Sequence, residues 1–72
     1  MAEEKDVEKS YGNRDAAAKL RRLADALEAG RVFRIQIGGE RVAVPPGVRV
    51  EFEYQREGDE EEVEIEVKWK KR

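Results

Sequence analysis

Residues 31–44 read RVFRIQIGGERVAV, two alternating runs of apolar and polar residues joined by a glycine pair. The pair at 38–39 suits a two-residue hairpin turn, because such turns need positive φ angles that glycine adopts without strain. In that register the facing pairs Ile35 with Val42 and Phe33 with Val44 lie on one side of the hairpin, and both are apolar. This stretch therefore predicts a β-hairpin with one apolar side.

A second hairpin is predicted in residues 48–70, VRVEFEYQREGDEEEVEIEVKWK, with Gly58 and Asp59 at its turn. Its facing apolar pairs would be Tyr54 with Val63, Phe52 with Ile65, Val50 with Val67 and Val48 with Trp69. The same register sets Glu53 opposite Glu64, and facing like charges destabilise a ladder. The apolar match still decides the register, because a slip of one residue would turn every glutamate toward the core.

A helix is predicted over residues 14–29, with Asn13 as its N-cap and Gly30 as the residue that ends it. Its apolar positions recur at the spacing of one helix face. They are Ala16, Leu20, Leu23, Ala24 and Leu27. The chain therefore presents an amphipathic helix ahead of its strands.

Residues 45–47 read Pro-Pro-Gly, a break that suits a tight turn. If this turn also joins paired strands, Val44 faces Val48 and all four strands form one antiparallel meander. The predicted fold class is α+β, with one N-terminal helix packed on a four-stranded antiparallel sheet in two layers. We expect a single domain over residues 13–72, preceded by residues 1–12 as a flexible segment or an additional edge strand.

Three stretches together resemble the Amphi-Trp domain, a small prokaryotic family. They are LRRLADALEAG (residues 20–30), VFRIQIGGERVAVP (residues 32–45) and the amphipathic last strand that carries Trp69. The resemblance covers residues 14–71. It implies no assigned active site, so no catalytic residue is carried over from it.

The residue types present argue against an enzyme. The chain has no histidine, cysteine or threonine, and Ser10 is its single serine, so the usual pairs of nucleophile and base cannot be assembled. One helix on one sheet also leaves little room for a pocket that would perturb carboxyl groups. We expect no catalytic residue, no cofactor and no small-molecule substrate.

Two binding chemistries remain to be weighed. The outward glutamates of residues 51–66 could attract cations weakly, but no loop has the calcium-binding spacing, so we expect no metal site. The segment KWKKR (residues 68–72) pairs basic residues with an aromatic ring that single-stranded nucleic acid could stack on. Neighbouring glutamates would repel phosphate, so weak single-stranded nucleic-acid binding around Trp69 is the alternative function.

The overall charge balance predicts no attraction to a membrane. Fifteen basic and 17 acidic residues nearly cancel, and no apolar run approaches the about 18 residues that a membrane span needs. The first ten residues, MAEEKDVEKS, lack the order of a signal peptide. We expect a cytoplasmic protein.

The predicted helix is too small for the predicted sheet. Four strands of eight residues give an apolar face of about 19 by 26 Å, and a helix about 10 Å wide covers about half of it. Uncovered apolar area usually marks an interaction site. We therefore expect an interaction or assembly module, as a homodimer or with another protein. The candidate surface residues are Phe33, Tyr54, Lys68, Trp69, Lys70 and Lys71.

Overall fold

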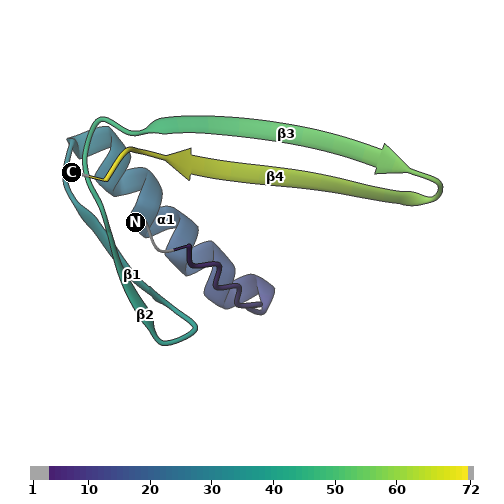
Figure 1. The fold of residues 1–72 in the computed structure, drawn as a ribbon, viewed down its shortest axis with the longest axis horizontal. Helices are drawn as coiled ribbons and strands as arrows, with labels where there is room; N and C mark the ends of the chain where they lie inside the picture. Colours follow the sequence, from purple (N-terminus) through teal and green to yellow (C-terminus); the bar gives the residue numbers. More distant parts are fainter. Residues whose placement is uncertain (1–3, 72) are drawn as a thin grey trace.

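The structure is a computed structural model that describes residues 4–71. Residues 1–3 of the predicted N-terminal segment and Arg72 of the basic C-terminal segment lie outside the described residues. Within residues 4–71, one helix and four strands follow each other (Figure 1). They are α1 (Asn13–Ala29), β1 (Phe33–Ile37), β2 (Glu40–Val44), β3 (Arg49–Glu57) and β4 (Glu60–Lys68). The predicted α+β class with antiparallel strands is confirmed.

Helix α1 begins one residue earlier than the sequence predicted. Gly12 is the N-cap, no side chain caps the first turn, and the Ala16 N–H donates to the Gly12 carbonyl at 2.9 Å. The prediction that Asn13 is the N-cap is therefore wrong, because Asn13 is already helical. At the other end Gly30 adopts φ 68°, the left-handed conformation that ends the helix as predicted.

Both hairpins have the registers that the turns and the alternation predicted. In β1–β2 the facing pairs include Ile35 with Val42, and in β3–β4 they include Phe52 with Ile65. The turn glycine Gly38 also allows a close approach, because a Cβ added there would lie 2.7 Å from Cγ1 of Val7. Turn chemistry and apolar pairing were thus sufficient to align each pair of strands.

The two hairpins do not join into the predicted four-stranded meander. They form two separate two-stranded sheets, β1–β2 and β3–β4, and β2 does not pair with β3. Pro45 and Pro46 have no backbone N–H to donate to a ladder, and Gly47 turns the chain with φ 78°. The ladder of β3–β4 ends at the pair Arg49 with Lys68, so the predicted facing of Val48 and Trp69 lies beyond it.

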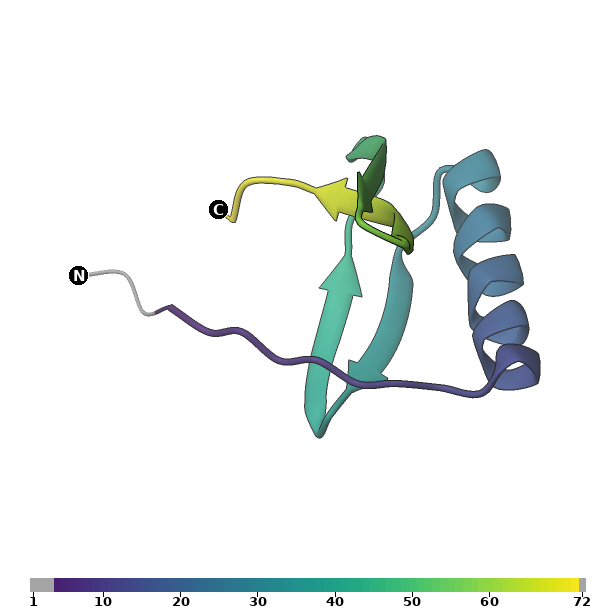
Figure 2. The same cartoon turned by 90° about the vertical axis from the view of Figure 1, so that its right-hand side faces the viewer.

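The core is small and lies between α1 and the first hairpin. Its buried residues are Ala26, Phe33 and Val44. Partly buried side chains pack around them, namely Leu23, Ile35, Val42, Val48 and Val67. We call α1 with β1 and β2 the body (residues 13–44), and β3 with β4 the arm (residues 49–68). The arm projects away from the body, and only its base lies near the core (Figures 1 and 2).

Residues 4–12 form no strand, so the additional edge strand is not present in this part of the N-terminal segment. The segment instead runs across the first hairpin near its turn (Figure 2). Lys5 Nζ lies 3.1 Å from Glu40 Oε1, and the Tyr11 hydroxyl donates to the Gln36 carbonyl at 3.2 Å. These contacts attach the segment to the body rather than to the arm.

Candidate interaction surface

The arm carries an exposed apolar side, because its ladder places Val50, Phe52 and Tyr54 beside Val67, Ile65 and Val63. Facing residues share one side of a sheet. The exposed fractions are 74% for Phe52, 67% for Val63 and 57% for Tyr54. We call the exposed members of this side, Val50, Phe52, Tyr54, Val63 and Ile65, the arm face.

The exposure of the arm face follows from how the arm is attached. Val48 and Val67 at its base pack against the core cluster, so the hairpin starts at the body. Its strands are nine residues long, which extends the hairpin about 30 Å at ~3.3 Å per residue. The outer part thus lies beyond the reach of the body's own side chains.

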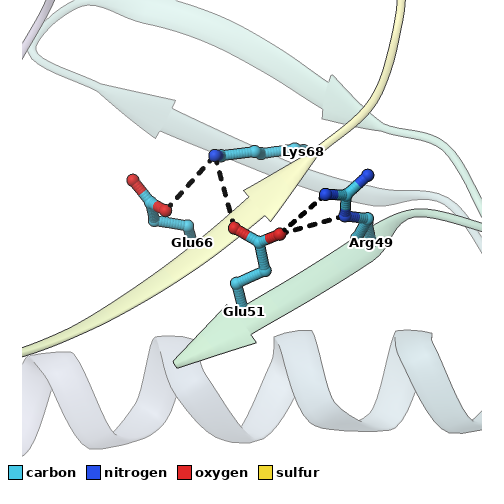
Figure 3. A network of polar contacts seen from close by, with 4 residues as sticks. All are labelled: Arg49, Glu51, Glu66 and Lys68. Atoms are coloured by element: carbon cyan, nitrogen blue, oxygen red, sulfur yellow. Dashed lines mark hydrogen bonds and ion pairs between the residues drawn. The ribbon is translucent and has the colours of Figure 1, made fainter. Parts of the chain in front are cut away.

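The opposite side of the arm is polar, and its base holds a network of four charged residues (Figure 3). Glu51 Oε2 accepts a hydrogen bond from Arg49 Nε at 3.0 Å, and Glu51 Oε1 lies 3.3 Å from Lys68 Nζ. Lys68 Nζ also lies 3.4 Å from Glu66 Oε1. Hydrogen bonds from Arg49 and Lys68 lower the pKa of Glu51, and the hydrogen bond to Glu51 raises the pKa of Lys68.

Farther along the same side, acidic residues face one another. Glu53 lies opposite Glu64 in the ladder. The hydrogen bond with Glu53 raises the pKa of Glu64, and the charge of Glu62 raises it further. The polar side of the arm therefore carries many negative charges at neutral pH.

The hydroxyl group of Tyr54 is held by a residue nearer the tip of the arm. The hydroxyl donates a hydrogen bond to Glu61 Oε1 at 2.8 Å. This hydrogen bond raises the pKa of Tyr54, because the bond would be lost with the hydroxyl proton. The ring thus stays on the arm face while its polar end is satisfied by the arm itself.

A second exposed apolar strip lies on the helix. Ala26 and Leu23 pack into the core, whereas Leu20 and Leu27 are 50% and 40% exposed. Ala24, between them on the same side, is also exposed. We call Leu20, Ala24 and Leu27 the helix flank.

The helix flank is uncovered because the first hairpin packs against another part of the apolar stripe of α1, where Leu23 and Ala26 lie. At this contact the Arg22 guanidinium donates to the Arg34 carbonyl at 2.7 Å and lies 5.1 Å from the Phe33 ring centre. The other two strands, which the sequence placed on this helix, belong to the projecting arm. The arm face and the helix flank are therefore uncovered for the same reason, namely that the arm does not pack on α1.

Trp69 lies just after β4 and is 40% exposed. With Lys70 and Lys71 it lines a shallow hollow whose other wall is the loop of Pro45, Pro46 and Gly47. An indole ring beside two lysines and a proline pair is a mixed apolar and cationic surface. It is separate from the arm face, which lies farther along the arm.

The family model of the Amphi-Trp domain matches residues 1–72, the whole chain. This chain belongs to the Amphi-Trp domain family. Neither the search of curated proteins nor the search of solved structures found a match to it. The resemblance of the three stretches is confirmed.

The six residues proposed from the sequence are not brought together in this Amphi-Trp domain. Phe33 is buried in the core, Tyr54 lies on the arm face, and Lys68 lies on the polar side of the arm. Trp69, Lys70 and Lys71 share the hollow at the base. The surface that the sequence reasoning missed is Phe52 with Val63 and Ile65, although the mismatch between helix and sheet area indicated that some apolar area would stay uncovered.

Within residues 4–71 no group of three or more acidic side chains is placed to hold a metal ion. The helix of this described region is not long and apolar enough to cross a membrane.

Proposed function

We propose that this Amphi-Trp domain is a non-enzymatic interaction module that binds a protein through the arm face. The observation that carries the proposal is the contiguous set of exposed apolar side chains on β3 and β4, centred on Phe52. Covering such a surface lowers the free energy of the system, because burial removes apolar area from water.

The size of the arm face supports a binding role. The arm face spans five residues of β3, about 16 Å, and two strands are about 10 Å wide, so it presents roughly 160 Å². At about 25 cal/mol per Å², covering that area contributes on the order of 4 kcal/mol before the costs of association. Scattered surface leucines or valines would not supply a comparable contribution in one place.

The polar side of the arm supports the same role. Glutamates at alternate positions keep a projecting hairpin soluble and discourage edge-to-edge pairing of strands. The alternation of glutamate with apolar residues in 62–67 thus separates a solvated side from a binding side. The arrangement favours contact through side chains of the arm face over strand addition at its edges.

The test compares wild type with Phe52→Glu and with Glu53→Gln, which changes the opposite side of the same strand. Light scattering over a concentration series measures self-association, and affinity capture read by mass spectrometry measures other partners. We expect wild type and Glu53→Gln to bind equally and Phe52→Glu to lose binding at least tenfold. A wild-type chain that stays monomeric and captures nothing beyond what Phe52→Glu captures would refute the proposal.

A second candidate function is weak binding of single-stranded nucleic acid at the hollow of Trp69. The exposed indole beside Lys70 and Lys71 favours it, since stacking on an aromatic ring with nearby cations is a common mode of single-strand binding. Titration with an oligonucleotide should quench Trp69 fluorescence, and the affinity should fall steeply with salt. No quenching at low salt would eliminate this candidate.

A further inference from the structure

We propose that the partner of the arm face is a second copy of this chain, whose helix flank it covers, so that two copies exchange arms reciprocally. This inference rests on the proposed function and adds the identity of the partner. Each copy would supply one arm face and one helix flank. The dimer would therefore close with two identical contacts, as a two-fold symmetric pair requires.

The two surfaces match in kind. The arm face and the helix flank are both apolar and both exposed in one chain, and they would form the two layers that the sequence pattern predicts. The arm face is about 16 Å long and the helix flank from Leu20 to Leu27 is about 12 Å long, so the two surfaces are similar in length. A strand pair lying on a helix is the ordinary layered packing of this fold class.

The connection between body and arm also favours the exchange of arms. The two prolines and Gly47 separate the hairpins and direct the arm away from its own helix (Figure 1). The arm therefore leaves its own helix flank open while presenting its apolar side elsewhere. A second copy placed across a two-fold axis fills both open surfaces at once.

The distribution of charge favours docking of the arm on the remainder of another copy. Residues 49–68 contain three basic and nine acidic side chains, a net charge of −6, and the whole chain carries −2, so the remainder carries +4. An arm that docks on the rest of another copy joins opposite charges, whereas two arms packed together would join two charges of −6. Electrostatics therefore favours the arm on the body over the arm on another arm.

Area sets the expected strength of the dimer. Each contact would cover roughly 160 Å² on the arm and a similar area on the helix side, and two contacts give about 640 Å² in total. Because stable specific interfaces bury about 1,200–2,000 Å², arm exchange predicts a weak dimer that dissociates on dilution.

The experiment uses the fact that the chain contains no cysteine. Phe52→Cys on one copy and Leu20→Cys on a ¹⁵N-labelled copy are mixed, and a short bis-maleimide crosslinker joins thiols that lie close together. Mass spectrometry identifies the mixed pair by its isotope label. Both positions are exposed in the single chain, so neither substitution removes a core side chain.

The control replaces Phe52→Cys by Glu53→Cys, the neighbouring position on the polar side of the arm. We expect the 52–20 crosslink to form at least fivefold more than the 53–20 crosslink. A 52–52 crosslink that exceeds the 52–20 crosslink would overturn the inference in favour of two arms packed together, and equal background yields from all pairs would overturn self-recognition altogether.

Failure of this inference is distinguishable from failure of the proposed function. If crosslinking stays at background while another protein is captured by wild type and not by Phe52→Glu, then the arm face binds a different partner and only the inference is lost. If Phe52→Glu changes neither self-association nor capture, the proposed function fails as well.

Discussion

The carboxylate of Glu64 is destabilised, because it faces the carboxylate of Glu53 across the arm. Its pKa is raised above the ordinary 4.5, so the folded state binds its proton more tightly than the unfolded state does. Stability therefore falls as pH rises from 4.5 through the raised pKa. We expect Glu64→Gln to raise the melting temperature slightly at pH 7, measured by circular dichroism, and to lose that advantage below pH 4.5.

Glu51 provides the matched control, because its pKa is shifted in the opposite direction to that of Glu64. Arg49 and Lys68 lower the pKa of Glu51, so the folded state favours its carboxylate. The stability that this provides is present above 4.5 and is lost as pH falls through the lowered pKa. Glu51→Gln should lower the melting temperature at pH 7. If Glu51→Gln and Glu64→Gln shifted the melting temperature in the same direction, the loss of a negative charge alone would explain both shifts. The contacts of each glutamate with its neighbours would then have no part in them.

The two phenylalanines have opposite roles despite similar surroundings in sequence. Phe33 is 7% exposed, beneath the Arg22 guanidinium, whereas Phe52 is 74% exposed. Urea unfolding at a concentration low enough to keep the chain monomeric should show a loss of about 3 kcal/mol for Phe33→Ala. Phe52→Ala should stay within about 0.5 kcal/mol of wild type. Comparable losses would mean that the monomer covers its arm face.

At the scale of elements, the start of α1 leaves a capping position unused. Gly12 has extended backbone angles, and a Cβ added there would meet no atom within 4 Å. We expect Gly12→Ser to stabilise the domain by about 0.5 kcal/mol, because its hydroxyl can accept from a free N–H of the first turn. Chemical denaturation measures the change. Gly12→Ala is the control, and an equal gain there would assign the effect to backbone entropy instead of capping.

The helix and hairpins could be predicted because each depends on nearby residues. The glycine pair at 38–39 and the facing of Phe52 with Ile65 fixed two registers without any knowledge of the remaining chain. The relation between the hairpins could not be predicted in this way. Alternation reveals which side of a strand is apolar, but it does not reveal which surface covers that side, and residues 45–47 permit more than one direction.

The same distinction explains the candidate site. Tyr54 is a predicted member of the apolar sheet area that the helix is too narrow to cover, and the structure exposes it. Phe33 has the same pattern around it but lies where α1 contacts β1, so its side chain is buried. Exposure of Phe52 and Val63 depends on the projection of the whole arm, which is a property of the molecule and not of the local sequence.

At the scale of the whole molecule, the charge difference between the arm and the remainder predicts how self-association responds to salt. If the acidic arm docks on the more basic body, screening weakens the attraction, and the dimer dissociation constant should rise severalfold between 0.05 and 0.5 M NaCl, because the Debye length is about 10 Å at 0.1 M. Apolar contact between the arm face and the helix flank should keep the dimer detectable at the higher salt. Two arms packed together would respond oppositely, since screening relieves their mutual repulsion. Sedimentation equilibrium across this salt series measures the constant, and tighter association at high salt would exclude the exchange of arms.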